Sequence, residues 1–164
     1  MTGPLQPDPL ARRIRLVRLL KRADFLRVAG NRLKWAASGL ILQAAPTPAD
    51  LVRDAQVRVG FTTSKKVGIA VERNRARRRL RAAVDEVFPS DAEAGWDYVV
   101  IGRRETIARP YSLLLQDLRG ALKRVGALRS DDGSDRRAPP HPAPASRSQG
   151  TGRQQPDGDV SEDA

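Results

Sequence analysis

Residues 64–81 read Ser-Lys-Lys-Val-Gly-Ile-Ala-Val-Glu-Arg-Asn-Arg-Ala-Arg-Arg-Arg-Leu-Arg, which places eight cations and one acid in a loop that runs into a helix. The helix is predicted from about residue 70 or 72 to Val87, with Pro89 as its stop signal. Leu80 shares one face with the apolar residues at helical spacing, namely Ala76, Ala83, Val84 and Val87. This face is predicted to lie on the core, which leaves the cations on the exposed side and along its edges.

The arginines of this helix repel one another more than they pair with acids. Like charges stand four residues apart in Arg73 and Arg77, in Arg75 and Arg79, and in Arg77 and Arg81. Each of these pairs costs up to ~0.5 kcal/mol. Only two favourable pairs are expected to offset them, Glu72 with Arg75 and Arg81 with Asp85. This pattern argues against a solvated face stabilised by charge pairs. It favours a surface for a polyanion, because cations that meet phosphates release condensed counterions.

Position around the helix separates the cations into groups. Arg77 and Arg81 stand at the edge of the core face, where they can line a groove. The cations predicted to point outward are Arg75, Arg78 and Arg79. Lys65 and Lys66 precede the helix, where ammonium groups, backbone N–H groups and the helix dipole all favour phosphate. Together these positions predict a nucleic-acid surface at the start and along the exposed side of the helix.

The whole chain of 164 residues has a formal net charge of +11, and this charge is unevenly distributed. Residues 1–128 carry +13 and residues 129–164 carry −2, so the basic character belongs to the predicted folded part.

The lack of cysteine excludes a disulfide framework and a thiolate metal site. The N-terminal stretch has no apolar signal core, and no apolar run approaches the ~18 residues of a spanning helix. We therefore expect a soluble cytoplasmic protein that does not contact a membrane.

One domain is predicted at residues 14–126. It lies between a disordered N-terminal extension at 1–13 and a disordered tail at 127–164, which is rich in Pro, Ser, Asp and Gly. Helices are predicted at 21–29 and 111–125, and strands at 33–36, 39–45, 56–63 and 98–102. With the central helix, these elements predict one sheet on which helices are laid.

The stretch from Gly60 to Arg81, which begins Gly-Phe-Thr-Thr-Ser-Lys-Lys, closely resembles the signature of the bacterial ribonuclease P protein component. Residues 20–28 (Leu-Lys-Arg-Ala-Asp-Phe-Leu-Arg-Val) and 97–103 (Asp-Tyr-Val-Val-Ile-Gly-Arg) resemble other parts of that family, and the resemblance covers about residues 14–126. It implies an α/β (α+β) two-layer sandwich of order αβββαβα with a four-stranded sheet. It also implies a left-handed βαβ crossover through the central helix, although general rules favour a right-handed one.

The same resemblance implies a function. The chain would be the protein subunit of a ribonucleoprotein that removes the 5′ leader from precursor tRNA, as a monomer in a 1:1 complex. It would bind the catalytic RNA and the precursor tRNA, but not DNA. The RNA subunit, on which Mg²⁺ is expected, would carry out the endonucleolytic hydrolysis. No cofactor is expected on the protein itself, and no catalytic or metal-binding residue is assigned to it.

Site residues follow from the family's motif positions. Those that match positions close to the catalytic RNA are Lys65, Lys66, Arg73, Asn74, Arg75 and Arg78. Those that match positions close to the leader are Phe25, Arg77 and Arg81. The departures from the family pattern are Ala29 in place of a second aromatic residue, Gln43 in place of a tyrosine and Ile69 in place of an asparagine. A cleft with fewer aromatic side chains is expected to hold the leader more through its phosphates. Core packing stays open as an alternative for Phe25 and Trp35.

Other functions stay open on the sequence alone. Protein nucleases usually need clustered carboxylates or paired histidines. His141 is the sole histidine, and the acids Asp24, Glu72, Asp85, Glu86 and Asp97 are scattered without ligand spacing. A basic ribosomal or RNA-chaperone protein would show no preference for leader-bearing tRNA. A DNA-binding module is disfavoured, because cations encircle the central helix and no dimerisation element is visible.

Overall fold

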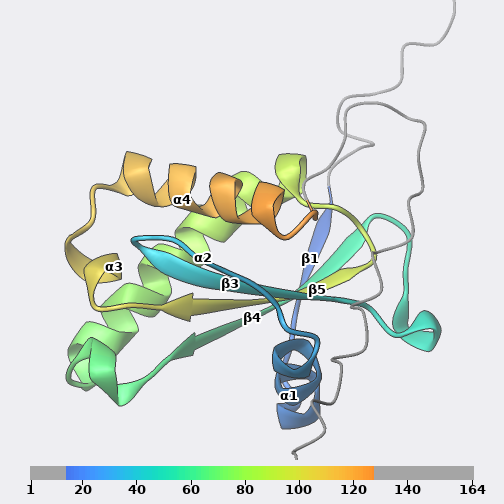
Figure 1. Cartoon of the computed structure of the whole chain (residues 1–164), viewed down its shortest axis with the longest axis horizontal. Helices are drawn as coiled ribbons and strands as arrows, with labels where there is room; N and C mark the ends of the chain where they lie inside the picture. The colour runs from blue at the N-terminus through green and yellow to red at the C-terminus, as the bar shows by residue number, and fades with distance from the viewer. Residues whose placement is uncertain (1–13, 128–164) are drawn as a thin grey trace, which may run out of the picture.

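The computed structural model describes residues 14–127, which form a five-stranded sheet with helices on both faces (Figure 1). In chain order the elements are β1 (Arg15–Arg18), α1 (Arg22–Gly30), β2 (Leu33–Ala36), β3 (Leu40–Pro46), β4 (Gln56–Thr63), α2 (Ala70–Asp91), β5 (Trp96–Gly102), α3 (Glu105–Ala108) and α4 (Tyr111–Arg124). Two 3₁₀ turns, η2 (Ala49–Leu51) and η3 (Lys65–Val67), precede β4 and α2. The predicted disordered tails and His141 lie outside the described residues, with one exception. Ala127, the first residue of the predicted C-terminal tail, is buried and donates its N–H to the Leu122 carbonyl.

The strands lie in the order β1-β4-β5-β3-β2. Strand β4 is parallel to both β1 and β5, whereas β3 runs antiparallel to β5 and β2 antiparallel to β3. All four predicted strands are present and the mixed α/β class is confirmed, but the prediction of a four-stranded sheet is wrong. Helix α2 connects the parallel strands β4 and β5, and the left-handed sense of this crossover stays a prediction.

The extra strand is β1, which sequence patterns miss because only four residues pair and two of them are arginines. It aligns Arg15 with Gln56 and Arg18 with Val59 on β4. The contact ends where the Leu19 N–H donates to the Val59 carbonyl at 2.9 Å. Beyond Val59, no strand within residues 14–127 pairs with that edge of β4. The second half of β4 therefore has a free edge beside α2.

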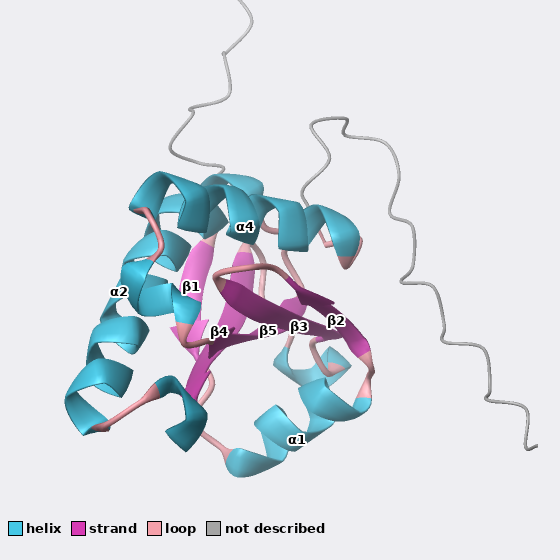
Figure 2. Ribbon diagram, turned by 60° about the vertical axis from the view of Figure 1, so that its left-hand side comes forward, coloured by secondary structure: helices cyan, strands magenta, loops and turns pink. Residues whose placement is uncertain are grey.

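Helices α2 and α4 lie next to each other on one face of the sheet (Figure 2). The predicted core face of α2 is confirmed, since its members Ala76, Leu80, Ala83, Val84 and Val87 are all buried. Helix α4 covers the rest of this face with its own buried leucines. Because one side of α2 is fixed in the core, its other side is held toward solvent in one orientation.

The prediction that α2 stops before Pro89 is wrong, because the helix runs through this residue to Asp91. Proline lacks an N–H, so the helix loses one hydrogen bond at Pro89. Other hydrogen bonds stabilise the last turn: the Ser90 hydroxyl donates to the Val87 carbonyl at 3.2 Å, and the Ile14 N–H donates to the Pro89 carbonyl at 3.3 Å. The last turn is therefore held by the chain segment that leads into β1.

The opposite face of the sheet carries α1, which adds a partial third layer to the predicted two-layer sandwich (Figure 1). Its apolar contact is small, since Val28 of α1 joins only Leu19, Ala45 and Val99 in a separate buried cluster. Phe25 packs at the margin of that cluster over Gly60, where an added Cβ would lie 2.5 Å from the ring. The Phe25 side chain thus reaches β4, whereas α1 itself lies on β3 and β5.

Candidate nucleic-acid interface

The start of α2 is built around Gly68, whose φ of 145° lies in a region that side-chain-bearing residues rarely adopt. The Glu72 carboxylate returns over this glycine and accepts the Ile69 N–H at 2.8 Å, which caps the helix. Val67 is buried, whereas Lys65 and Lys66 in the same turn are exposed. The two lysines are therefore held at the helix start, as the sequence predicts.

The six arginines of α2 form no salt bridge with any acid of residues 14–127. The two expected pairs, Glu72 with Arg75 and Arg81 with Asp85, do not form. Glu72 is engaged as the helix cap instead. Uncompensated cations on one helix destabilise a protein, so this surface is suited to an anion from outside the chain.

Two of the outward arginines, Arg75 and Arg78, are exposed as predicted. The prediction that Arg79 also points outward is wrong, because it is half-buried and donates to the Arg109 carbonyl in the loop before α4. Arg73 turns back over the helix start and donates to the Gly68 carbonyl at 3.1 Å. Carbonyl oxygens carry no net charge, so these bonds orient the guanidinium groups without neutralising them.

Arg77 and Arg81 lie at the free edge of β4, at the border of the core face where the helical pattern places them. Arg77 donates to the Thr63 hydroxyl at 3.1 Å, and the guanidinium carbon of Arg81 lies 5.9 Å from the centre of the Phe61 ring. Burial lowers the pKa of Arg81, the positive charges of Arg18 and Arg77 lower it further, and Asp85 opposes them. Sequence reasoning missed Arg18, because its place beside Arg81 depends on the unpredicted strand β1.

A pocket along the exposed flank of α2 is lined by Val71, Asn74, Arg77, Arg78 and Arg81. Two of these residues, Asn74 and Arg78, belong to the set assigned to catalytic RNA, and two, Arg77 and Arg81, to the leader set. The two sets therefore meet on α2 and form one continuous surface. Four of the five lining residues offer hydrogen-bond donors, which suits phosphate oxygens and base edges.

Phe25 lies apart from that pocket, on the other face of the sheet. Its ring covers Gly60, whereas Arg81 lies over Phe61, the next residue of β4. The residues assigned to the leader therefore lie on both faces of β4, near its free edge. At the departures from the family pattern, Ala29 is exposed, Gln43 is half-buried, and Ile69 is 68% exposed at the start of α2. Trp35 is 40% exposed on β2, with the guanidinium carbon of Arg124 4.9 Å from its ring centre.

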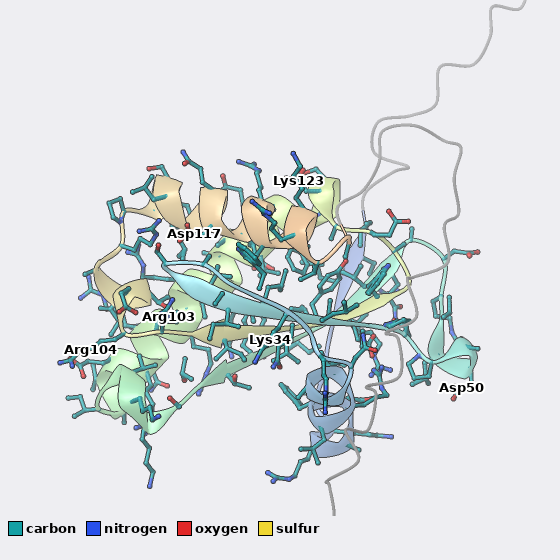
Figure 3. All side chains as sticks on the ribbon, in the orientation of Figure 1. Lys34, Asp50, Arg103, Arg104, Asp117 and Lys123 are labelled. Carbon is teal, nitrogen blue, oxygen red and sulfur yellow. The ribbon has the colours of Figure 1, made fainter. Side chains whose placement is uncertain are left out.

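The ends of the parallel strands bring one further cation to this region. Thr63 at the end of β4 aligns with Gly102 at the end of β5, so the chain leaves both strands on the same side of the sheet. Arg104 follows β5 there, is exposed, and lies at the end of the molecule where α2 begins (Figure 3). Adjacent parallel strands predict this neighbourhood, so Arg104 was accessible to sequence reasoning.

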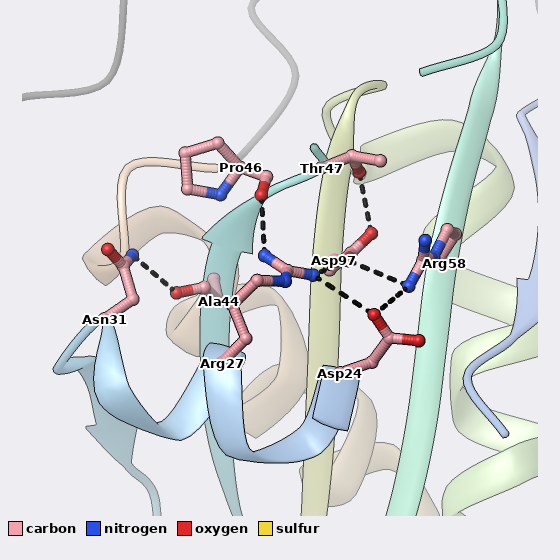
Figure 4. Close-up of polar contacts among 8 residues, drawn as sticks. All are labelled: Asp24, Arg27, Asn31, Ala44, Pro46, Thr47, Arg58 and Asp97. Carbon is pink, nitrogen blue, oxygen red and sulfur yellow. Dashed lines mark hydrogen bonds and ion pairs between the residues drawn. The ribbon is translucent and has the colours of Figure 1, made fainter. Parts of the chain in front are cut away.

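A buried polar cluster fastens α1 to the sheet (Figure 4). Asp97 on β5 is fully buried and accepts hydrogen bonds from Arg27 of α1 and, at 2.7 Å, from the Thr47 hydroxyl. Arg58 on β4 reaches both Asp97, at 3.3 Å, and Asp24 of α1, at 2.8 Å. Asp24 and Asp97, which the sequence presents as scattered acids, thus share two arginines. Within the part of the chain that the structure describes, no three His, Asp or Glu side chains are grouped as metal ligands.

Among residues 14–127, no helix combines the length and the apolar character needed to cross a bilayer.

The fold resembles solved ribonuclease P proteins. The protein of Staphylococcus aureus superimposes with a TM-score of 0.56 at 23% identity, over 68% of this chain and 97% of that one. The protein of Thermotoga maritima gives a TM-score of 0.54 at 22% identity, over 65% of this chain and 96% of that one. At these identities the likeness concerns the fold alone.

Sequence relatives are much closer. The ribonuclease P protein component of Paramagnetospirillum magneticum is 71% identical over 114 residues, which cover 70% of this chain and 86% of that protein. The component of Ruegeria pomeroyi is 50% identical over 110 residues, which cover 66% of this chain and 86% of that protein. The family model for ribonuclease P matches residues 14–126, the segment that holds the sheet, the capped start of α2 and its unpaired arginines. The chain therefore belongs to the family of ribonuclease P protein components.

Proposed function

We propose that this chain binds the RNA subunit of ribonuclease P and the 5′ leader of precursor tRNA, and thereby assists removal of the leader. The observation that carries the proposal is the surface of α2, where six arginines lack an acidic partner among residues 14–127. A folded RNA supplies the missing negative charge. Each phosphate contact releases counterions, so the complex is expected to weaken as salt rises.

Two parts of this surface differ in exposure, which supports a division of labour. The exposed part carries groups that suit a folded RNA backbone, namely Lys65, Lys66, Asn74, Arg75 and Arg78, with Arg73 at the helix start. The part at the edge of β4 carries half-buried Arg77 and Arg81, with Phe25 around the same strand. An extended single strand fits along such an edge, with cations for its phosphates and a ring for a base.

The chemical step belongs, in this proposal, to the RNA subunit and its Mg²⁺. The protein's residues bind phosphates and fix the leader, so the protein has no catalytic role of its own. It acts as a monomer in a 1:1 complex in the cytoplasm, without DNA as a partner. Family membership favours this function over the ribosomal, RNA-chaperone and DNA-binding alternatives.

Reconstitution with the RNA subunit at low Mg²⁺ tests the proposal. Cleavage and binding are measured for precursor tRNA with a leader and for mature tRNA without one. We expect the protein to increase cleavage at low Mg²⁺ and to strengthen binding only when the leader is present. Equal stimulation of binding for both RNAs would support the RNA-chaperone alternative. Cleavage by the protein freed of RNA would contradict the assignment of chemistry to the RNA subunit.

A further inference from the structure

We infer that Asp97 is a positioning residue for leader recognition: through Arg27 and Arg58 it fixes helix α1, and α1 holds Phe25 over Gly60. This inference rests on the proposed function, because it concerns the part of the surface assigned to the leader. Asp97 is fully buried below α1 and so would not touch RNA itself. Its effect on binding has to pass through the helix.

The contacts of Asp97 come from three different segments. Arg27 comes from α1, Arg58 from β4, and Thr47 from the loop after β3. Arg27 also donates to the Pro46 carbonyl at 2.9 Å, and Asn31, which follows α1, donates to the Ala44 carbonyl at 3.0 Å. These bonds tie the last turn of α1 to the sheet, and the ion pair between Asp24 and Arg58 ties its first turn.

Polar contacts matter unusually much here because the apolar seat of α1 is small. Val28 is the one buried residue of this helix, whereas α2 buries six. Two acids and two arginines make the cluster electrically balanced, so it tolerates burial. Replacing the Asp97 carboxylate by an amide would leave Arg27 and Arg58 with Asp24 as the single acid. The two like charges would then repel each other in a poorly hydrated site.

The position of Phe25 makes it sensitive to that change. Phe25 directly follows Asp24 and lies two residues before Arg27, so members of the cluster flank it in the helix. Its ring contacts Gly60, where there is no side chain to re-seat it if α1 moves. A small rotation of α1 would therefore displace the ring from the free edge of β4, while α2 on the other face keeps its place.

The test uses the complex reconstituted with the RNA subunit and measures its leader preference, the ratio of affinities for leader-bearing and mature tRNA. We expect Asp97→Asn to lower this preference about fivefold, a size typical of coupled neighbours, with little change in affinity for the RNA subunit. Phe25→Ala should lower it similarly, and the double variant should lose no more than Phe25→Ala alone. Asp50→Asn, at an exposed residue, controls for the change in net charge.

A second variant covers the case in which Asp97→Asn does not fold, as judged by circular dichroism. Arg27→Gln removes the α1 side of the same contact at a half-buried position, and we expect the same selective loss. Leu118→Ala, buried on the opposite face, controls for general destabilisation and should leave the preference of the folded fraction unchanged. Wild-type preference in Asp97→Asn or Arg27→Gln, or a multiplicative loss in the double variant, would overturn the inference. A wild-type complex without any leader preference would instead overturn the proposed function.

Discussion

The guanidinium group of Arg81 lies over the ring of Phe61, with 5.9 Å between its central carbon and the ring centre. The contact holds a long cationic side chain along the free edge of β4 instead of extending it into solvent. Asp85, one helical turn away, forms no ion pair with it, and burial together with Arg18 and Arg77 lowers its pKa. An arginine fixed in this way is poised for an anion that follows the strand edge.

Replacing Arg77 and Arg81 together by alanine should therefore weaken discrimination in favour of the 5′ leader. Affinity for the RNA subunit should change less, because the exposed cations of α2 remain. The measurement is the pair of dissociation constants for leader-bearing and mature tRNA, alongside the constant for the RNA subunit. Lys34→Ala with Lys123→Ala removes the same charge at exposed positions on β2 and α4. Equal losses in both assays for the arginine variant would refute the division of labour.

Local sequence patterns predicted this site well where one element carries the information. Strand β4 was predicted at 56–63 and spans Gln56–Thr63, because apolar and polar residues alternate along it. The buried face of α2 was predicted because helical spacing alone decides which side chains turn inward. For the same reason, helical spacing predicts the edge position of Arg77 and Arg81, which contact Thr63 and Phe61 of β4.

What the sequence did not predict depends on segments far apart in the chain. Strand β1 exists because Arg15–Arg18 pairs with β4 some 40 residues later, and four residues give no period long enough to recognise. The cluster around Asp97 joins residues 70 positions apart, from Arg27 to Asp97. Only the packing of α1 on the sheet brings these two side chains together, and no local pattern in the sequence encodes that packing. The same holds for Arg18, whose positive charge lowers the pKa of Arg81 because β1 pairs with β4.

Gly60→Ala should destabilise the protein, because the new methyl group would lie 2.5 Å from the Phe25 ring. Overpacking of this kind typically costs ~1–3 kcal/mol. The cost should largely vanish when Phe25 is also replaced by alanine, since the methyl group then fills space that the ring has left. Urea unfolding of the two single variants and the double variant measures this coupling. Additive effects in the cycle would show that Phe25 does not rest on Gly60.

Gly68→Ala should loosen the start of α2, because φ is 145° there and a Cβ would overlap the Glu72 carboxylate. Backbone strain of this type costs ~1–3 kcal/mol. The helix cap on Ile69 would be lost with it, so Lys65 and Lys66 would leave their fixed positions. We expect lower stability in urea and weaker binding to the RNA subunit.

Gly120→Ala provides the matched control for that substitution. Gly120 lies within α4, is exposed, and has nothing within 4 Å of an added Cβ. Alanine at a helical site without strain should stabilise the protein by ~0.4–1 kcal/mol. The two variants should therefore shift the urea midpoint in opposite directions. If Gly68→Ala left both stability and RNA affinity unchanged, the capped turn would have no role in placing the lysines.

The exposed cations should show their phosphate contacts through salt dependence. Lys65, Arg75 and Arg78 are exposed and have no acidic partner in residues 14–127, so alanine at each should change stability by no more than ~0.5 kcal/mol. Each substitution that removes one phosphate contact should reduce the slope of log K against log salt by ~0.7–0.9, because fewer counterions are released. Binding to the RNA subunit, titrated across a range of salt concentrations, gives these slopes. Lys123→Ala on α4 should leave the slope unchanged, and an equal reduction there would mean that net charge, and not the α2 surface, controls the affinity.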